Sequence, residues 1–256
     1  MAMRVVALLL MLVVTACGGE ATPRAKSTPT PTPTPIKVVG ECTPGAAPYV
    51  VYLHGLGSST ADLSGLITHV GAKDPARGWC SYDRINAGRS ARDPSDQPLA
   101  ESVTELEEFL AAQGIEGPVL LVGHSYGGLL ATAYAGKNPD RVHGIVLADP
   151  ALPFELPLFT PKVRRAVEQI TARNPENVDL LGSYREAARA TLPDVPFVFV
   201  DAAQEDLPTG WGAKGYRKAL TGFIASLPQG RLVESPTDHI DVLDAPELVA
   251  AVLDVS

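Results

Sequence analysis

The sequence predicts an α/β fold in which a mostly parallel central sheet is flanked by helices. Short apolar runs rich in β-branched residues alternate with helix-forming stretches, a pattern typical of parallel sheets. One such run, residues 119–122, passes through a glycine-rich turn into a helix-forming stretch at 129–137. Residues 38–256 follow a proline-rich segment, and their number suits one domain of this class.

The first 16 residues predict an export signal that is removed. Arg4 precedes an apolar run at residues 5–14, which is too short for a permanent membrane helix. The following Val14-Thr15-Ala16-Cys17 resembles the lipobox of bacterial lipoproteins. This resemblance implies cleavage before Cys17, a lipid on its sulfur, and a mature protein anchored to the outer face of the bacterial cell membrane. An ordinary secretory signal is the alternative.

Residues 17–37 are expected to be a linker. Their repeated Thr-Pro pairs disfavour helices and sheet ladders and favour an extended, polyproline-like chain. The globular domain is therefore expected at residues 38–256.

The elements of this domain follow from apolar runs, helical stripes and turn residues. A break in the alternation at residues 151–193 contains prolines and two polar helical segments, 162–173 and 183–190, which we interpret as a small helical cap over the site. The expected strands are 49–53, 79–85, 119–122, 142–148, 196–200 and 231–234, and the expected helices are 60–70, 99–113, 129–137, 213–226 and 245–252.

Charge and cysteine content limit the partners of the domain. The net charge of −8 argues against nucleic acid and provides no basic patch for anionic lipid. Cys42 and Cys80 stand near the starts of neighbouring expected strands, so in an oxidising compartment they are expected to form a disulfide, with two free thiols as the alternative. Neither cysteine lies in a cluster with zinc-ligand spacing.

The segment Gly123-His124-Ser125-Tyr126-Gly127 is the strongest candidate for a catalytic motif. A strand before it and a helix after it are the context of a nucleophile elbow, in which a strained turn presents the serine at the end of the sheet. The flanking glycines leave room where a Cβ would clash. The alternative is a glycine-rich turn that contains a serine by chance.

Together with His54-Gly55, Asp83-Arg84, Asp149-Pro150 and His239, this motif resembles the α/β-hydrolase family over about residues 41–256. The resemblance implies the α/β-hydrolase fold. It also implies that Ser125 is the nucleophile, that His239 is the general base, and that the backbone N–H groups of Leu56 and Tyr126 form an oxyanion hole. Two departures stand out: the family's usual Gly-x-Gly is Asn86-Ala87-Gly88 here, and a usual glycine is Ala202.

The acid that orients His239 has three candidates. The family's usual position follows the strand at 196–200, where Glu205 and Asp206 are neighbours, and Asp206-Leu207-Pro208 resembles a common ending of that loop. We therefore favour Asp206. Glu205 remains open, and so does Asp149, which serves as the acid in a minority of relatives.

These observations predict a serine hydrolase, most plausibly a carboxylesterase that cleaves small or medium acyl esters, works without a metal or organic cofactor, and is a monomer. A peptidase, amidase or thioesterase would use the same triad. A non-catalytic envelope-binding protein on the same fold is the alternative from a different class.

Overall fold

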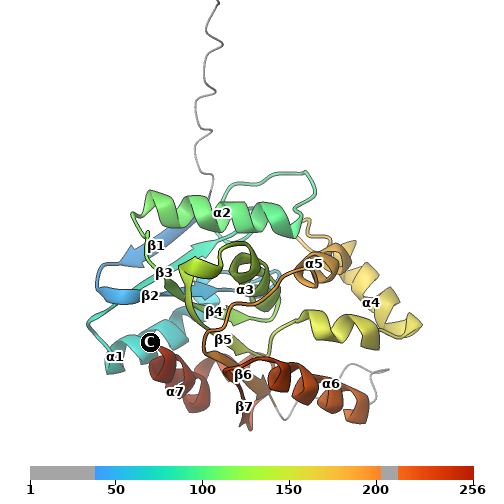
Figure 1. Cartoon of the computed structure of the whole chain (residues 1–256). Coiled ribbons are helices and arrows are strands. Elements are labelled where there is room, and N and C mark those ends of the chain that lie inside the picture. The colour runs from blue at the N-terminus through green and yellow to red at the C-terminus, as the bar shows by residue number, and fades with distance from the viewer. Residues whose placement is uncertain (1–37, 203–212) are drawn as a thin grey trace, which may run out of the picture. The chain divides into compact units, whose positions relative to one another are not determined.

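A seven-stranded sheet organises the part of the chain that the computed structural model describes, residues 38–202 and 213–256. The strand order is β1-β3-β2-β4-β5-β6-β7, and all neighbouring pairs are parallel except β1 with β3 (Figure 1). The strands are β1 Val39–Thr43, β2 Ala46–Leu53, β3 Arg77–Asp83, β4 Val119–His124, β5 Val142–Ala148, β6 Phe197–Ala202 and β7 Gly230–Ser235.

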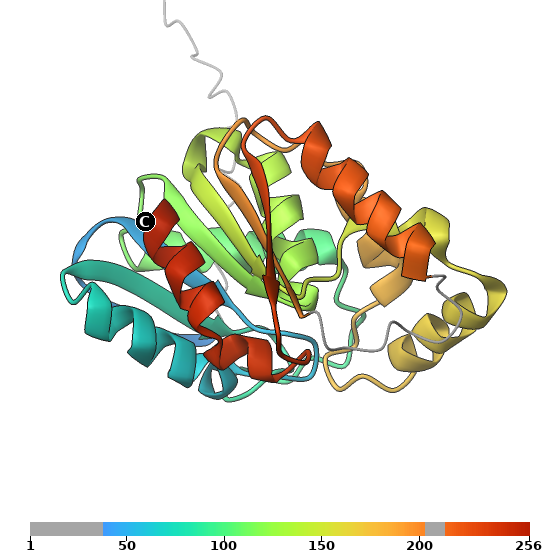
Figure 2. The same cartoon turned by 90° about the horizontal axis from the view of Figure 1, so that it is seen from below.

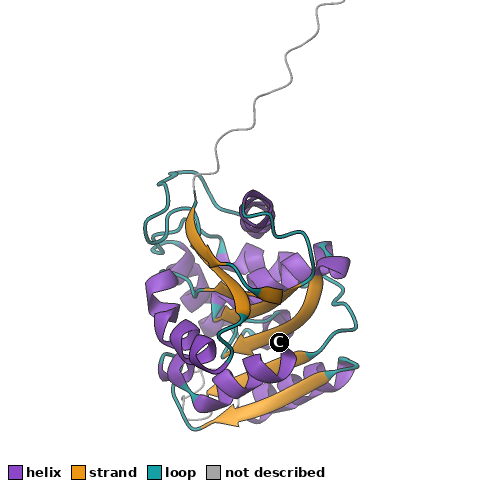
Figure 3. Cartoon of the chain, turned by 90° about the vertical axis from the view of Figure 1, so that its left-hand side faces the viewer, coloured by secondary structure: helices purple, strands orange, loops and turns teal. Residues whose placement is uncertain are grey.

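Helices cover both faces of this sheet (Figures 2 and 3). Helices α1 and α7 pack on one face, and α2, α3 and α6 pack on the other. The helices are α1 Ser64–Lys73, α2 Leu99–Ala112, α3 Tyr126–Lys137, α4 Pro161–Thr171, α5 Leu180–Ala187, α6 Ala213–Ser226 and α7 Pro246–Val255. Short 3-10 helices are η1 Thr60–Leu63, η2 Pro139–Arg141, η3 Pro153–Leu158 and η4 Asp241–Asp244.

The apolar strands supply both halves of the core, because successive side chains of a strand point to opposite faces. In β4, Leu121 belongs to the cluster beneath α2 and α3, whereas Leu120 and Val122 belong to the cluster beneath α1 and α7. The same alternation runs through β2, β5 and β6. Burial on both faces explains why these strands are continuous apolar runs in the sequence. The predicted fold class is confirmed.

Strand β1 was not expected from the sequence. Its five residues, VGECT, are only partly buried or exposed, so they carry no continuous apolar run. The strand pairs antiparallel with β3 and places Cys42 opposite Cys80. A disulfide joins these two cysteines, which confirms the predicted pairing. It links the edge strand to a strand that the core buries.

The segment between β5 and β6 contains η3, α4 and α5, and we call residues 151–193 the cap, as in the sequence analysis. Helix α4 begins at Pro161 after the N-cap Thr160, whose side-chain oxygen accepts a hydrogen bond from the Val163 amide at 3.3 Å. Helix α5 begins after Asp179, which caps the Gly182 amide in the same way. Figure 1 shows α5 beside α3, the helix that follows the glycine-rich motif, and α4 on the outer side of α5.

Residues 1–37, which include the predicted signal segment and Cys17, lie outside the described part of the chain. Among the described helices, none is both long and apolar enough to cross a membrane.

Candidate active site

Ser125 stands at a sharp turn between β4 and α3. Its φ of 50° and ψ of −118° are a strained backbone conformation for a residue with a side chain. The neighbouring glycines permit this turn, since a Cβ on Gly123 would lie 2.7 Å from the Gly127 carbonyl oxygen, and a Cβ on Gly127 would overlap the carbonyl oxygen of Leu53. Helix α3 begins at Tyr126, three residues earlier than expected, and therefore includes Gly127 and Gly128. The turn is a nucleophile elbow in its geometry.

His239 and Asp149 are paired at the same edge of the sheet. His239 lies in the loop after β7, and its Nδ1 is 2.5 Å from Oδ2 of Asp149, which directly follows β5. The two side chains are 34% and 17% exposed, so the pair is partly accessible to solvent. A carboxylate that accepts a hydrogen bond from Nδ1–H fixes the tautomer in which Nε2 of the imidazole carries the lone pair that a general base needs.

Of the three predicted acids, Asp149 lies within the described part of the chain, and it has this geometry. The favoured Asp206 and its neighbour Glu205 lie outside the described residues. Ala202, which replaces a usual glycine, ends β6, and its amide points at Oδ1 of Asp149 from 3.5 Å. The Asp149 backbone has a φ of 38°, an unusual conformation that turns its side chain out of the strand direction.

The two predicted oxyanion-hole residues lie beside Ser125. Leu56, Tyr126 and Ser125 line one cavity. The volume of this cavity is about 490 Å³. Tyr126 is the first residue of α3, so its N–H lacks a partner from within the helix. The described residues offer no backbone acceptor for the amide of either Leu56 or Tyr126. Both amides therefore remain candidates for the oxyanion hole.

This cavity is mainly apolar, and the cap forms much of its wall. Helix α4 turns a stripe of Val163, Val167 and Ile170 toward it, spaced as one face of a helix. Lys162 is the only charged residue among the described lining residues. The described residues that line it are Leu56, Ser125, Tyr126, Ala151, Phe159, Lys162, Val163, Ala166, Val167, Ile170, Leu180 and Tyr184.

Two other histidines support the site without facing the cavity. His124 places Nε2 2.8 Å from the backbone oxygen of His239, and the two rings lie 4.6 Å apart. Burial lowers the pKa of His124 to about 4. His54 is fully buried, and burial together with the nearby Arg84 charge lowers its pKa well below the usual range. Neutral imidazoles at both positions fit a structural role.

A buried ion pair adjoins the oxyanion residues. Arg84, at the end of β3, and Glu176, in the loop between α4 and α5, are 2% and 1% exposed, and Arg84 Nε lies 2.9 Å from Glu176 Oε2. The sequence analysis used Arg84 only as part of a motif and did not identify Glu176. Glu176 sits in a polar stretch, 92 residues from its partner, so no local pattern marks it.

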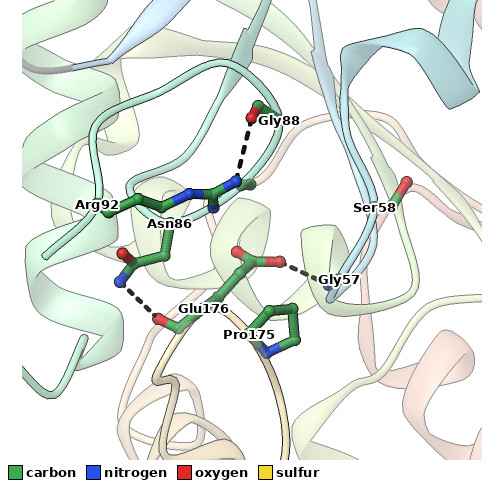
Figure 4. Close-up of a pocket in the computed structure, with 8 residues that line it drawn as sticks. Gly57, Ser58, Asn86, Gly88, Arg92, Pro175 and Glu176 are labelled. Carbon is green, nitrogen blue, oxygen red and sulfur yellow. Dashed lines mark hydrogen bonds between the residues drawn. The ribbon is translucent and has the colours of Figure 1, made fainter. Parts of the chain in front are cut away.

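Asn86 explains one departure from the family pattern. Its φ of 68° is in the left-handed region, which asparagine tolerates better than most residues. Its side-chain amide donates to the backbone oxygen of Asp93 at 2.7 Å. It also donates to the backbone oxygen of Glu176 at 3.3 Å, as Figure 4 shows. An asparagine can therefore make the turn where the family usually has glycine, and it also holds the loop of Glu176.

A second buried carboxyl group lies on the other side of the cap. Glu155, in η3, is 4% exposed, and its Oε2 is 2.5 Å from the hydroxyl of Tyr184. Burial raises the pKa of Glu155 to about 8, and the charge of Asp149 adds to this effect. Tyr184 lines the cavity, so the protonated carboxyl group supports one of its walls.

Comparison with known proteins places this geometry in context. Residues 50–254 match the model of the Alpha/beta hydrolase family. Lipase LipV of Mycobacterium tuberculosis is 33% identical over 148 residues, which cover 56% of this chain and 52% of the lipase. The (Lyso)-N-acylphosphatidylethanolamine lipase of Bos taurus is 39% identical over 106 residues, 40% of this chain and 30% of that protein. The matches thus span about half or less of these relatives.

Structural similarity covers more of the chain than these sequence matches do. The crystal structure of Paleococcus ferrophilus monoacylglycerol lipase superposes with a TM-score of 0.58, covering 84% of this chain and 99% of the lipase at 16% identity. At that identity the likeness establishes the shared fold.

Proposed function

The chain belongs to the alpha/beta hydrolase family, and from this premise we propose that it is a serine hydrolase, a carboxylesterase that cleaves small or medium acyl esters. The observation that carries the proposal is the strained Ser125 at the mouth of an apolar cavity, with the His239–Asp149 pair at the same sheet edge. A serine in a strained backbone conformation, at the same sheet edge as an oriented imidazole, is costly to maintain without a catalytic role.

In the proposed mechanism, the Ser125 hydroxyl attacks the ester carbonyl carbon while His239 Nε2 accepts its proton. Asp149 accepts a hydrogen bond from the Nδ1–H of His239 and stabilises the imidazolium that forms. The amides of Leu56 and Tyr126 donate to the oxygen that becomes negative in the tetrahedral intermediate. His239 then protonates the departing alcohol, and a water molecule, deprotonated by the same histidine, releases the acid from Ser125.

The cavity supports an apolar acyl group as substrate. Its volume of about 490 Å³ lies in the range of pockets for small molecules, and valine, isoleucine and leucine side chains line it. Burying each methylene of an acyl chain there contributes about 0.8 kcal/mol. The names of the two lipase relatives are compatible with an acyl ester substrate.

The proposal is tested by labelling residues 38–256 with a fluorophosphonate probe and reading intact mass. We expect one adduct on the parent and on Ser58→Ala, a control serine near the same sheet edge, and none on Ser125→Ala. An ester series of increasing acyl length should then give a maximum at short or medium chains. Labelling that persists in Ser125→Ala would overturn the assignment of Ser125 as the nucleophile, and no labelling of the folded parent would favour a binding protein. Faster turnover of amides or thioesters than of matched esters would change the reaction class.

We propose Asp149 as the acid of the triad. Asp149→Asn should lower kcat by about 10⁴-fold, because the imidazole loses the partner that fixes its tautomer. Asp206→Asn and Glu205→Gln serve as matched controls and should stay within a few-fold of the parent. Steady-state hydrolysis of one 4-nitrophenyl ester by all three variants decides the matter: a large loss in Asp206→Asn alone would restore the assignment favoured by the family pattern.

We further propose that the protein is exported and held at the outer face of the membrane by a lipid on Cys17. The signal-like first 16 residues and the Cys42–Cys80 disulfide, which persists in oxidising compartments, support this proposal. Expression of the full chain in a bacterium with an alkyne fatty acid should label the parent but not Cys17→Ser, and the variant should leave the membrane fraction. Equal labelling of both would refute the anchor.

A further inference from the structure

We propose that Glu176 of the cap is a positioning residue: through Arg84 it fixes the oxyanion loop, residues 54–57, and so makes the oxyanion hole depend on how the cap is seated. This inference rests on the proposed serine hydrolase function. It assigns a role in the reaction to a residue that touches neither the nucleophile nor the cavity.

Arg84 holds the peptide that carries one oxyanion donor. Its Nη1 donates to the backbone oxygen of His54 and its Nη2 to that of Gly55, both at 2.8 Å. The Gly55 carbonyl and the Leu56 N–H belong to one planar trans peptide, in which the two groups point in opposite directions. Holding the carbonyl at Arg84 therefore fixes the direction of the Leu56 N–H.

Glu176 fixes the next peptide along the loop. Its Oε1 accepts a hydrogen bond from the Gly57 N–H at 2.6 Å, as Figure 4 shows. The peptide planes before and after Leu56 are thus each held by one member of the ion pair. Gly57 has a φ of 73°, so the chain turns sharply at this point, and the hydrogen bond to the carboxylate fixes this turn.

The same carboxylate also determines where the guanidinium lies. Arg84 donates Nε to Oε2 at 2.9 Å and Nη2 to Oε1 at 3.1 Å, a two-point contact that specifies orientation as well as distance. The guanidinium carbon lies 5.0 Å from the ring centre of Tyr126, the residue that supplies the second oxyanion amide. One cation therefore holds the peptide that carries the first proposed donor and lies over the ring of the residue that carries the second.

Glu176 is part of the cap, and its loop is fastened to the sheet domain at several points. Asn177 donates from Nδ2 to the Asp93 backbone oxygen at 3.0 Å, and Val178 pairs with Gln97 in an isolated bridge. Helices α4 and α5, on either side of this loop, line the cavity. A cap displaced from its seat would remove the counter-ion of Arg84 and release the oxyanion loop.

A merely structural ion pair would affect stability but not the chemistry at the carbonyl oxygen. The two roles are separated by comparing 4-nitrophenyl butyrate with its thiono analogue, in which sulfur replaces the carbonyl oxygen. An oxyanion hole aligned for oxygen favours the oxo ester, because sulfur is larger and a weaker hydrogen-bond acceptor. Loss of alignment therefore lowers the ratio of the two kcat/KM values, whereas loss of folded protein lowers both equally.

We expect Glu176→Gln to reduce kcat for the oxo ester by about 10- to 100-fold, less than the 100- to 1,000-fold typical of losing a donor outright, with KM changed less than threefold. The oxo-to-thiono ratio should fall with it. Asn177→Gly is the matched control: it removes one side-chain contact of the cap but keeps the hydrogen bond from the Gln97 N–H to the backbone oxygen of residue 177 at 2.9 Å, so the loop stays seated. Glycine also tolerates the φ of 56° at that position. This variant should keep the parent's ratio. All rates are normalised to fluorophosphonate-titrated sites.

An unchanged ratio in Glu176→Gln with titratable sites would overturn the inference, and so would an equal fall in Asn177→Gly. If Glu176→Gln does not fold, Glu176→Asp decides, because it retains the charge for Arg84 but withdraws the carboxylate from Gly57; its ratio should fall for the same reason. A parent inactive toward both esters and the fluorophosphonate would instead remove the proposed function itself.

Discussion

Two buried carboxyl groups of the cap avoid an unpaired charge in opposite ways. Glu176, at the oxyanion loop, and Glu155, behind the cavity wall, are both carboxyl groups excluded from water. Glu176 faces a guanidinium at 2.9 Å. Glu155 faces the Tyr184 hydroxyl, and burial raises its pKa to about 8. One side of the cap therefore contains a buried ion pair, whereas the other contains a neutral acid at pH 7.

The difference indicates what each region requires. Charged, two-point hydrogen bonds fix direction, which an oxyanion loop needs. An apolar cavity is better lined by neutral groups, since an unpaired charge beside it would be costly to desolvate. The ion-pair side should thus be sensitive to the loss of a partner, and the neutral side should be sensitive to pH.

Removing the cation should have the largest effect. Arg84→Met leaves Glu176 buried without a counter-ion and should lower the free energy of unfolding by about 3–5 kcal/mol at pH 7. Urea denaturation followed by tryptophan fluorescence measures it. The double variant Arg84→Met/Glu176→Gln should regain part of that loss, because the uncompensated charge is gone. A double variant no more stable than the single one would contradict this account.

The neutral side should show its effect in the pH dependence of stability. The folded Glu155 keeps its proton up to about pH 8, whereas an unfolded glutamate loses it near its usual value of 4.5. Between these values the folded state binds more protons, so stability falls as pH rises, by at most about 1.4 kcal/mol per pH unit from this group. Glu155→Gln should remove that fall.

A partly buried carboxyl group, Glu105, determines the pH range in which the contribution of Glu155 to the free energy of unfolding is best measured. Burial raises its pKa to about 7, so it adds a fall of the same sign at lower pH. Between pH 7 and 8.5 the unfolding free energy of Glu155→Gln should therefore be flatter than that of the parent. Parallel curves across this window would show that Glu155 is not a buried neutral acid.

The smallest effect is expected at the hydroxyl that faces Glu155. Tyr184→Phe removes a hydrogen bond of 2.5 Å but keeps the ring that packs on Phe159. Thermal unfolding at pH 6 should report a loss of about 1 kcal/mol, the usual net value of one hydrogen bond. The loss should be clearly smaller than that of Arg84→Met. A loss of equal size would contradict the claim that the ion pair is more sensitive to losing a partner than the neutral acid is.

The sequence predicts well those features whose cause is local. The buried strands are recognisable because both faces are apolar, and Ser125 is recognisable because a strained turn requires glycines on both sides. Strand β1 was missed, since a half-exposed edge strand has no such run. Helix α3 begins earlier than its composition suggests, because packing at the elbow outweighs the low helix propensity of Gly127 and Gly128.

The partners within the site are harder to predict, because they come from distant parts of the chain. Asp149 and His239 are separated by 90 positions and meet only because β5 and β7 both end at the same edge of the sheet. The short motif around Asp206 favoured a different acid, and nothing within a few residues of Asp149 marks its orientation. Glu155 stands in an apolar, proline-containing stretch and Glu176 in a polar loop, and neither local sequence indicates that the side chain is buried.

The ion pair between Arg84 and Glu176 has a consequence for chimeric enzymes. It joins a residue of the sheet domain to one of the cap. A cap transplanted from a relative to change acyl preference would bring new cavity walls, but it would also replace Glu176. Unless the donor cap offers a carboxylate at the same place, the chimera should bind its new ester and turn it over slowly. In an alignment of relatives, positions 84 and 176 should accordingly vary together.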